Sequence, residues 1–266
     1  MSSIFSSTSE APIGVFDSGV GGLSVLQALQ KQLPGENFLY LADSLRVPYG
    51  GKSKEVVVRY TKEAIDFLFR QEVKAVVVAC NTASSLALPN LEPNQRVFNV
   101  ISPVVPAALA YQGRIGIIGT VGTVRSQAYQ RQLAQKGRVS WAKACPLLVP
   151  VVEEGLSQDL VADLLCSYYL QDAPSDLGGL ILGCTHYPFL AHAIARVLPN
   201  VPLIDSAGPT ALELRRYLQS QGLLAQREKG DCQHFVTGDP EVYQDLARLL
   251  GSDPGMVQRV ELGRGD

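Results

Sequence analysis

Short apolar runs that stop abruptly at small polar residues constrain the fold of this 266-residue chain most. The clearest run covers residues 75–79, is rich in valine, and is followed at once by Cys80, Asn81 and Thr82. Such a run is typical of a strand that is buried on both faces and leads into a helix start.

The same pattern recurs about a hundred residues downstream. Residues 179–183 form a second apolar run, and Cys184, Thr185 and His186 follow it. Ligands of open α/β sheets bind beyond the carboxyl ends of the strands. We therefore expect one site with a thiol on each side.

Each cysteine taken alone is better explained as a buried structural residue, since free cysteine is among the most buried residue types. The matched polar followers favour a functional interpretation for Cys80 and Cys184. Cys145, Cys166 and Cys232 lack such followers, so we interpret them as structural.

Strands alternate with helices along most of the chain, which predicts an α/β fold with mainly parallel sheets. We expect two similar lobes with the active site in the cleft between them. The first lobe is predicted to comprise residues 11–105 and about 217–266, and the second residues 106–216. Residues 1–10 are predicted to be a mobile tail. A long helix capped by Ser53 and further helices over residues 124–136 and 156–170 are also predicted.

Composition excludes several classes of protein. With 46% hydrophobic and 18% charged residues, the chain is ordinary for a globular protein. A net charge of -2 without a basic stripe argues against nucleic acid as a partner. No apolar run approaches the roughly 18 residues that span a membrane. The first residues lack the features of a signal peptide, so we expect a reducing, cytoplasmic setting without disulfides.

A metal centre is not expected. The chain has no Cys-x-x-Cys pair and no His-Glu-x-x-His motif, and it has only three histidines. The glycine-rich turns at residues 19–22 and 116–122 are weak hints of a nucleotide site, because neither completes a dinucleotide fingerprint.

Two thiols that face one carbon atom suggest proton transfer. A helix start favours the thiolate, and free cysteine has a pKa of about 8.5, so a modest downward shift makes it a base at neutral pH. A base on one face of a carbon and an acid on the other can invert a stereocentre.

Three further groups are candidates for the same site. Asp17 and Ser18 end the first predicted strand, where they are either a capping pair or a carboxylate that relays a proton or binds an ammonium group. His186 follows Cys184 closely enough to tune its thiolate. Glu153 precedes Gly155 after an apolar run, and the sequence does not decide between it and Glu154.

Several motifs together resemble the glutamate racemases of the aspartate/glutamate racemase family. They occur in the expected order over residues 12–250: Val15-Phe16-Asp17-Ser18, Pro48-Tyr49-Gly50, Ala79-Cys80-Asn81-Thr82-Ala83, Val149-Pro150 with Glu153-Glu154-Gly155, Gly183-Cys184-Thr185-His186-Tyr187-Pro188 and Thr237-Gly238-Asp239-Pro240.

The resemblance implies a cofactor-independent enzyme that interconverts L- and D-glutamate and supplies D-glutamate for peptidoglycan, cell wall biogenesis and cell shape. It implies that Cys80 and Cys184 exchange the proton, that Asp17 assists Cys80, and that His186 and Glu153 assist Cys184. It also implies a second lobe inserted into the first, and a homodimer. The substrate-binding residues it implies are Asp17, Ser18, Tyr49, Gly50, Asn81, Thr82, Thr185 and His186.

Other functions stay open at this point. A related racemase acting on aspartate or hydantoins would keep both cysteines. A nicotinamide enzyme would use the glycine turns. A non-catalytic, two-lobed amino-acid-binding protein would need the carboxylate contacts but no thiols.

Overall fold

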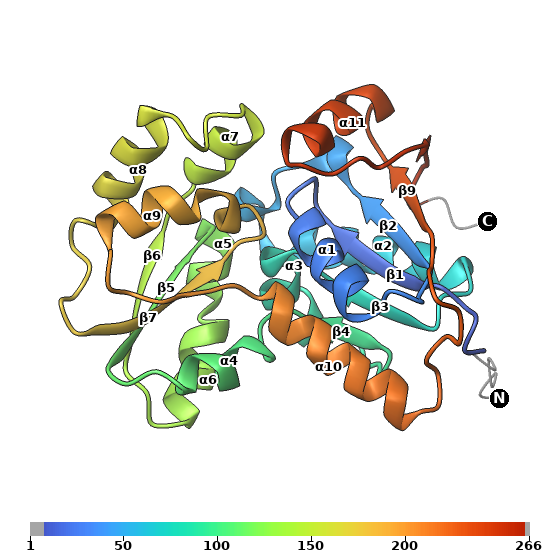
Figure 1. The fold of residues 1–266 in the computed structure, drawn as a ribbon, viewed down its shortest axis with the longest axis horizontal. Coiled ribbons are helices and arrows are strands. Elements are labelled where there is room, and N and C mark those ends of the chain that lie inside the picture. The colour runs from blue at the N-terminus through green and yellow to red at the C-terminus, as the bar shows by residue number, and fades with distance from the viewer. Residues whose placement is uncertain (1–7, 264–266) are drawn as a thin grey trace.

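The structure, a computed structural model, describes residues 8–263, and the strands in that range form two sheets (Figure 1). All strand pairs in both sheets are parallel, which confirms the predicted two-lobed α/β fold. The larger sheet has the order β10 (Val257–Arg259), β9 (Cys232–Val236), β2 (Phe38–Ala42), β1 (Ile13–Asp17), β3 (Ala75–Val78), β4 (Val97–Asn99). The smaller has the order β6 (Ser140–Ala144), β5 (Arg114–Gly119), β7 (Leu177–Gly183), β8 (Leu203–Ile204).

Helices cover the faces of both sheets (Figure 1). The α-helices are α1 (Leu23–Gln32), α2 (Lys54–Arg70), α3 (Asn81–Leu86), α4 (Val104–Leu109), α5 (Val121–Ser126), α6 (Ala128–Gln135), α7 (Leu148–Glu153), α8 (Leu160–Leu170), α9 (Ala191–Val197), α10 (Ala207–Ser220) and α11 (Pro240–Leu249). Short 3-10 turns follow β2 at Ser44–Arg46 and Tyr49–Gly51, and others lie at Leu88–Asn90 and Tyr187–Leu190.

Each sheet has a hydrophobic core on both faces, which explains why its central strands are apolar at every position. Along β3, Val77 joins the core beneath α1 and α10, whereas its neighbours Val76 and Val78 join the core beneath α2. In β7, Leu180 and Ile181 likewise lie in different cores. The period-2 geometry of a strand thus places consecutive side chains in opposite layers.

The chain passes between the two sheets twice, and both crossings lie earlier than predicted. Val100 packs in the core of the larger sheet and Ile101 in that of the smaller. On return, Ile204 belongs to the smaller sheet, and α10 from Ala207 onward packs against α1. The sequence placed α10 largely in the second lobe, because an amphipathic pattern shows that a helix has an apolar face but not which sheet that face covers.

Local signals explain the other differences in secondary structure. The helix predicted over residues 124–136 is split into α5 and α6 at Gln127, whose backbone is left-handed. The helix predicted from residue 156 begins only at Leu160, where the Asp159 side chain caps it. The predicted cap of α2 is present, since Ser53 Oγ accepts a hydrogen bond from the Val56 N–H.

The predicted mobile tail is only partly within the described residues, because residues 1–7 lie outside them. Two residues of the predicted tail, Ser9 and Glu10, are bound to the rest of the chain. The Ser9 carbonyl accepts a hydrogen bond of 2.6 Å from Lys74 Nζ, and the Glu10 carboxylate forms an ion pair with Arg227. Lys74 is fully buried and also pairs with Glu36. Between residues 8 and 263, no helix is long and apolar enough to cross a membrane.

Candidate active site

Three strands deliver the central side chains of the site. Asp17 ends β1, Cys80 follows the neighbouring strand β3, and Cys184 follows β7 of the other sheet. Asp17 is fully buried, and each of the two cysteines is 6% exposed. The two thiols therefore approach the boundary between the lobes from opposite sheets.

Both thiols line one small cavity of about 40 Å³ between the two sheets. Ten of the residues expected at the site also line it: Ser18, Tyr49, Gly50, Cys80, Asn81, Thr82, Glu153, Cys184, Thr185 and His186. Asp17 lies behind the cavity wall, where its Oδ2 accepts a hydrogen bond of 2.9 Å from the Gly19 N–H. The remaining lining residues include Val47 and Thr120, which sequence reasoning did not single out.

On one side of the cavity, a chain of polar groups leads away from Cys184. Its Sγ lies 3.8 Å from His186 Nδ1, and His186 Nε2 lies 3.1 Å from Glu153 Oε1. Burial alone would lower the pKa of His186, but its contacts with Cys184 and Glu153 raise it to about 10. The imidazole is therefore cationic at neutral pH. Glu153, and not its exposed neighbour Glu154, contacts the histidine.

The other side of the cavity lacks such a chain. The Cys80 thiol donates a long hydrogen bond of 3.6 Å to Ser18 Oγ. Burial, reinforced by the negative charge of Asp17, raises the pKa of Cys80 to about 12. The expectation that the helix start favours its thiolate is wrong here, because loss of hydration outweighs the few backbone dipoles of the short helix α3. Cys80 is a neutral thiol at pH 7.

Asp17 interacts with groups from both sheets. The pKa of Asp17 is raised overall, because the effect of burial outweighs the opposing effects of the positive charge of His186 and the Gly19 N–H. Thr185 Oγ1 lies 3.5 Å from Asp17 Oδ1. The carboxylate therefore links the turn beside Cys80 to the residues that follow Cys184.

Tyr49 is buried and lines the cavity, and its hydroxyl has a partner that is not among the lining residues. That hydroxyl donates a hydrogen bond to the fully buried carboxylate of Asp43, which also accepts one of 2.8 Å from Thr237 Oγ1 and pairs with Arg46. Sequence reasoning missed Asp43, although its position one residue beyond β2 is the same strand-end signal that marks Asp17. Asp43 anchors the loop that presents Tyr49 and Gly50.

Hydroxyl groups join the two lobes beside the thiols. Thr82 Oγ1 lies 2.8 Å from Thr120 Oγ1, and Asn81 Nδ2 donates a 2.8 Å hydrogen bond to the hydroxyl of Tyr129. Asn81 Oδ1 is buried, and nothing in the described part of the chain pairs with it. Thr120 precedes α5, and Tyr129 lies in the first turn of α6. Both are in the other lobe and far along the chain from Asn81 and Thr82, so no local sequence pattern predicts these contacts.

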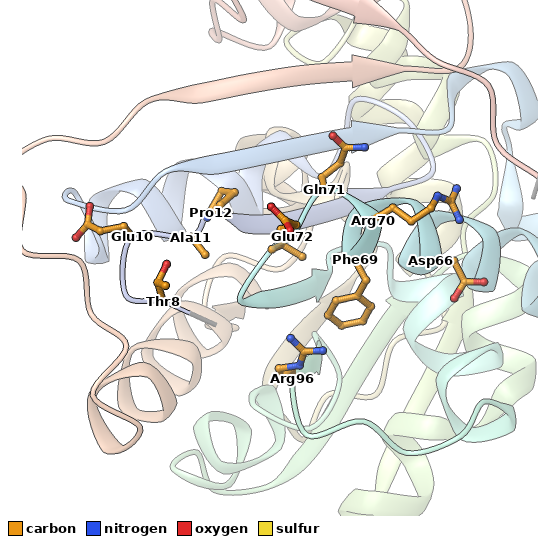
Figure 2. Close-up of a pocket in the computed structure, with 11 residues that line it drawn as sticks. Thr8, Glu10, Ala11, Pro12, Asp66, Phe69, Arg70, Gln71, Glu72 and Arg96 are labelled. Carbon is orange, nitrogen blue, oxygen red and sulfur yellow. The ribbon is translucent and has the colours of Figure 1, made fainter. Parts of the chain in front are cut away.

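A much larger hollow, about 870 Å³, lies elsewhere: residues 8–12 before β1 meet the end of α2 there (Figure 2). Arg96 lies over the ring of Phe69, with 4.6 Å between its Cζ and the ring centroid. No thiol or histidine lines this hollow. It therefore lacks paired thiols, and the small cavity between Cys80 and Cys184 is the candidate active site.

Elsewhere in the described residues, Cys232 and His234 are also in contact, with 3.4 Å between Sγ and Nε2. All five cysteines are free thiols, and burial raises the pKa of Cys145 and Cys166. Within residues 8–263, no group of three or more His, Cys, Asp or Glu side chains is placed to hold a metal ion.

Known proteins share both the sequence and this architecture. Residues 13–213 match the family model described as Asp/Glu/Hydantoin racemase. A glutamate racemase of Thermus thermophilus is 55% identical over 255 residues, which cover 95% of this chain and 97% of the relative.

Two solved structures of glutamate racemases have a fold similar to that of this chain. The crystal structure of a Thermus thermophilus glutamate racemase in complex with β-chloro-D-alanine superimposes with a TM-score of 0.90 at 55% identity, and covers 96% of this chain and 98% of that one. A Francisella tularensis glutamate racemase in complex with D-glutamate gives 0.89 at 32% identity, with 95% and 98% covered. The chain belongs to the Asp/Glu/Hydantoin racemase family.

Proposed function

We propose that the protein is a cofactor-independent glutamate racemase that uses two cysteines. One observation carries the proposal: two thiols supplied by different sheets line the same buried cavity, together with amide and hydroxyl groups. Similarity over nearly the full length to enzymes named glutamate racemase supports glutamate as the substrate.

The reaction needs a base on one face of the α-carbon and an acid on the other. A thiolate removes the α-proton, the electron pair stays on the substrate as a carbanion, and the opposite thiol donates its proton to the other face. The cationic His186, held by Glu153, lies beside the Cys184 sulfur, and Cys80 begins as the neutral thiol. After one turnover the two sulfur atoms have exchanged protonation states.

The residues around the thiols suit an amino acid with two carboxylates. The amide of Asn81 and the hydroxyls of Ser18, Thr82 and Thr185 line the cavity and can hydrogen-bond to carboxylate and ammonium groups. The unpaired Oδ1 of Asn81 offers an acceptor for an ammonium hydrogen. Because the Tyr49 hydroxyl is bound to Asp43, the Tyr49–Gly50 pair would contact the substrate through its backbone.

The lobes must separate to admit the substrate. The cavity has a volume of only about 40 Å³, and the side chains of Cys80, Cys184 and His186 that line it are almost fully buried, so an amino acid can enter only if the lobes move apart. We assign residues 8–100 and 207–263 to one lobe and 101–206 to the other, following the packing of their cores. Closure would then exclude water from the carbanion.

We infer the cellular setting from the resemblance to the family. D-glutamate made here would serve peptidoglycan synthesis, and hence cell wall biogenesis and cell shape. Five free cysteines support a reducing, cytoplasmic compartment. We propose a homodimer, which light scattering of the purified protein would test.

Circular dichroism of L-glutamate solutions tests the function directly. The purified protein, without added cofactor, should bring the signal of either enantiomer to zero. Parallel assays with aspartate and a hydantoin would identify a related racemase, and activity that requires NAD would indicate a nicotinamide enzyme. Tight binding of glutamate without loss of optical activity would show a binding protein and overturn the proposal.

A further inference from the structure

Tyr129 on α6 contacts the residues next to both thiols, although it does not line the cavity between them. Its ring packs against Gly183, which directly precedes Cys184, and a Cβ atom added to Gly183 would lie 3.2 Å from Tyr129 Cε2. Its hydroxyl accepts the 2.8 Å hydrogen bond from Nδ2 of Asn81, which directly follows Cys80. One fully buried side chain therefore contacts both strand ends that carry a thiol.

The hydroxyl of Tyr129 also determines how the amide of Asn81 is oriented. Burial raises the pKa of Tyr129, so the hydroxyl keeps its single proton at neutral pH. It donates that proton to the Val100 carbonyl oxygen in a long hydrogen bond of 3.5 Å, and its oxygen accepts from Asn81 Nδ2. Asn81 Oδ1, which is buried and has no partner within residues 8–263, is then the amide atom available to a ligand in the cavity.

These contacts join the two lobes at the first crossing of the chain. Val100 packs in the core of the larger sheet, whereas Ile101 packs with Tyr129 in the core of the smaller sheet. Both hydrogen bonds of the Tyr129 hydroxyl therefore run to the other lobe, while its ring stays in the core of its own lobe. The hydroxyl can be removed without removing the ring, so the two kinds of contact can be tested separately.

We propose that Tyr129 is a positioning residue for the racemase reaction, which holds the strand end of Cys80, through Asn81, against the strand end of Cys184. Proton transfer between carbon and sulfur depends steeply on geometry, since a displacement of about 1 Å can cost about 10²-fold in rate. Because Tyr129 does not line the cavity, it acts through Asn81 and Gly183 and not on the substrate itself. The effect on the reaction rests on the proposed function, whereas the contact between the lobes does not.

Tyr129→Phe tests the role of the hydroxyl in turnover. It should lower kcat/KM about tenfold for either enantiomer of glutamate, because the Asn81 amide is no longer held. Tyr187→Phe is the matched control and should stay near the wild type, since Tyr187 is equally buried but its hydroxyl bonds within its own lobe. In an Asn81→Ala background, Tyr129→Phe should lower kcat/KM by less than about twofold, because the partner is already absent.

Alkylation of the thiols by iodoacetamide tests the same contact without using activity. Cys80 and Cys184 are each only 6% exposed, so the reagent reaches them when the lobes separate. Tyr129→Phe should speed the alkylation of Cys80 several-fold, as measured by peptide mass spectrometry, and Tyr187→Phe should not. Asn81→Ala has a rate of its own, and adding Tyr129→Phe to it should change that rate by less than about twofold.

Three results would overturn the inference. Two of them are a kcat/KM near the wild type in Tyr129→Phe and an unchanged rate of Cys80 alkylation in that variant. The third is an undiminished effect of Tyr129→Phe in the Asn81→Ala background, which would make Tyr129 a residue of the core alone. A wild-type protein without racemase activity would instead overturn the proposed function, and the alkylation rates would still test the contact.

Discussion

The two thiols both follow a parallel strand, but their surroundings differ. Cys80 and Cys184 are both almost fully buried. Cys184 has the His186–Glu153 pair beside it, whereas Cys80 has the Ser18 hydroxyl and the buried carboxylate of Asp17 nearby.

The comparison shows that the position of each sulfur atom and its protonation state have different causes. The strand end determines where the sulfur lies, and the neighbouring charges determine whether it carries a proton. A pKa of about 10 keeps His186 cationic, and one of about 12 keeps Cys80 neutral, so the two sides of the cavity differ in charge at neutral pH.

Replacing either sulfur should have the largest effect. Cys80→Ser and Cys184→Ser should each lower kcat by about 10³-fold in both directions, because a hydroxyl is a far weaker acid than a thiol and both faces are needed in every turnover. Rates from both enantiomers, measured by circular dichroism, test this prediction. Cys232→Ser provides the control outside the cavity and should retain activity. Near-normal turnover by either active-site variant would contradict the paired roles.

Removing the charge behind His186 should have an intermediate effect and act on the Cys184 side alone. In Glu153→Gln the imidazolium loses its carboxylate, so the pKa of His186 falls and the alkaline limb of the pH profile of kcat moves to lower pH. We expect kcat to fall about tenfold at pH 8. Glu154→Gln, one residue away and exposed, is the matched control. An equal shift in both variants would show that the contact with His186 has no special role.

The same pair predicts a dependence of stability on pH. The pKa of His186 is raised in the folded protein from 6.5 to about 10, so its contribution to stability is complete below pH 6.5 and disappears as pH rises toward 10. Urea unfolding at several pH values should show this decline in the wild type and a smaller decline in Glu153→Gln. An identical decline in the two proteins would assign it to other groups.

Two buried tyrosines allow a smaller test of the comparison. The hydroxyl of Tyr40 donates to the Gly19 carbonyl beside Asp17, and that of Tyr187 donates to the Cys145 carbonyl in the other lobe, each at 2.8 Å. Replacing either by phenylalanine leaves a buried carbonyl unpaired and should cost about 1–3 kcal/mol of stability.

The two tyrosine variants should differ in activity. Gly19 lines the cavity and Cys145 does not, so Tyr40→Phe should lower kcat about fivefold while Tyr187→Phe stays near the wild type. Thermal unfolding and steady-state rates measure the two effects separately. A larger loss of activity in Tyr187→Phe would reverse the proposed importance of the two carbonyls.

The sequence predicted the placement of the thiols because that placement is local. Valine-rich strands that end in Cys-Asn-Thr and Cys-Thr-His mark two strand ends, and parallel sheets bring such ends to one edge. The contacts of these residues are nonlocal. Nothing near Tyr49 indicates that its hydroxyl binds Asp43, and nothing near Asn81 indicates Tyr129.

Burial explains the main error about the site. The helix start suggested a thiolate at Cys80, but the cost of removing a charge from water depends on the whole surrounding core, which a linear sequence does not show. The misplaced lobe boundary has a similar origin, since the face of α10 is visible in the sequence and its partner α1 is not.

Racemisation in deuterated water, followed from the first turnovers, tests the central claim that two thiols act on opposite faces of one carbon. Starting from either pure glutamate enantiomer, mass spectrometry after chiral separation should find deuterium at the α-carbon of the newly formed enantiomer and almost none in the remaining substrate. Early deuterium in both enantiomers at similar levels would indicate a single base that exchanges its proton with solvent, and would contradict the account.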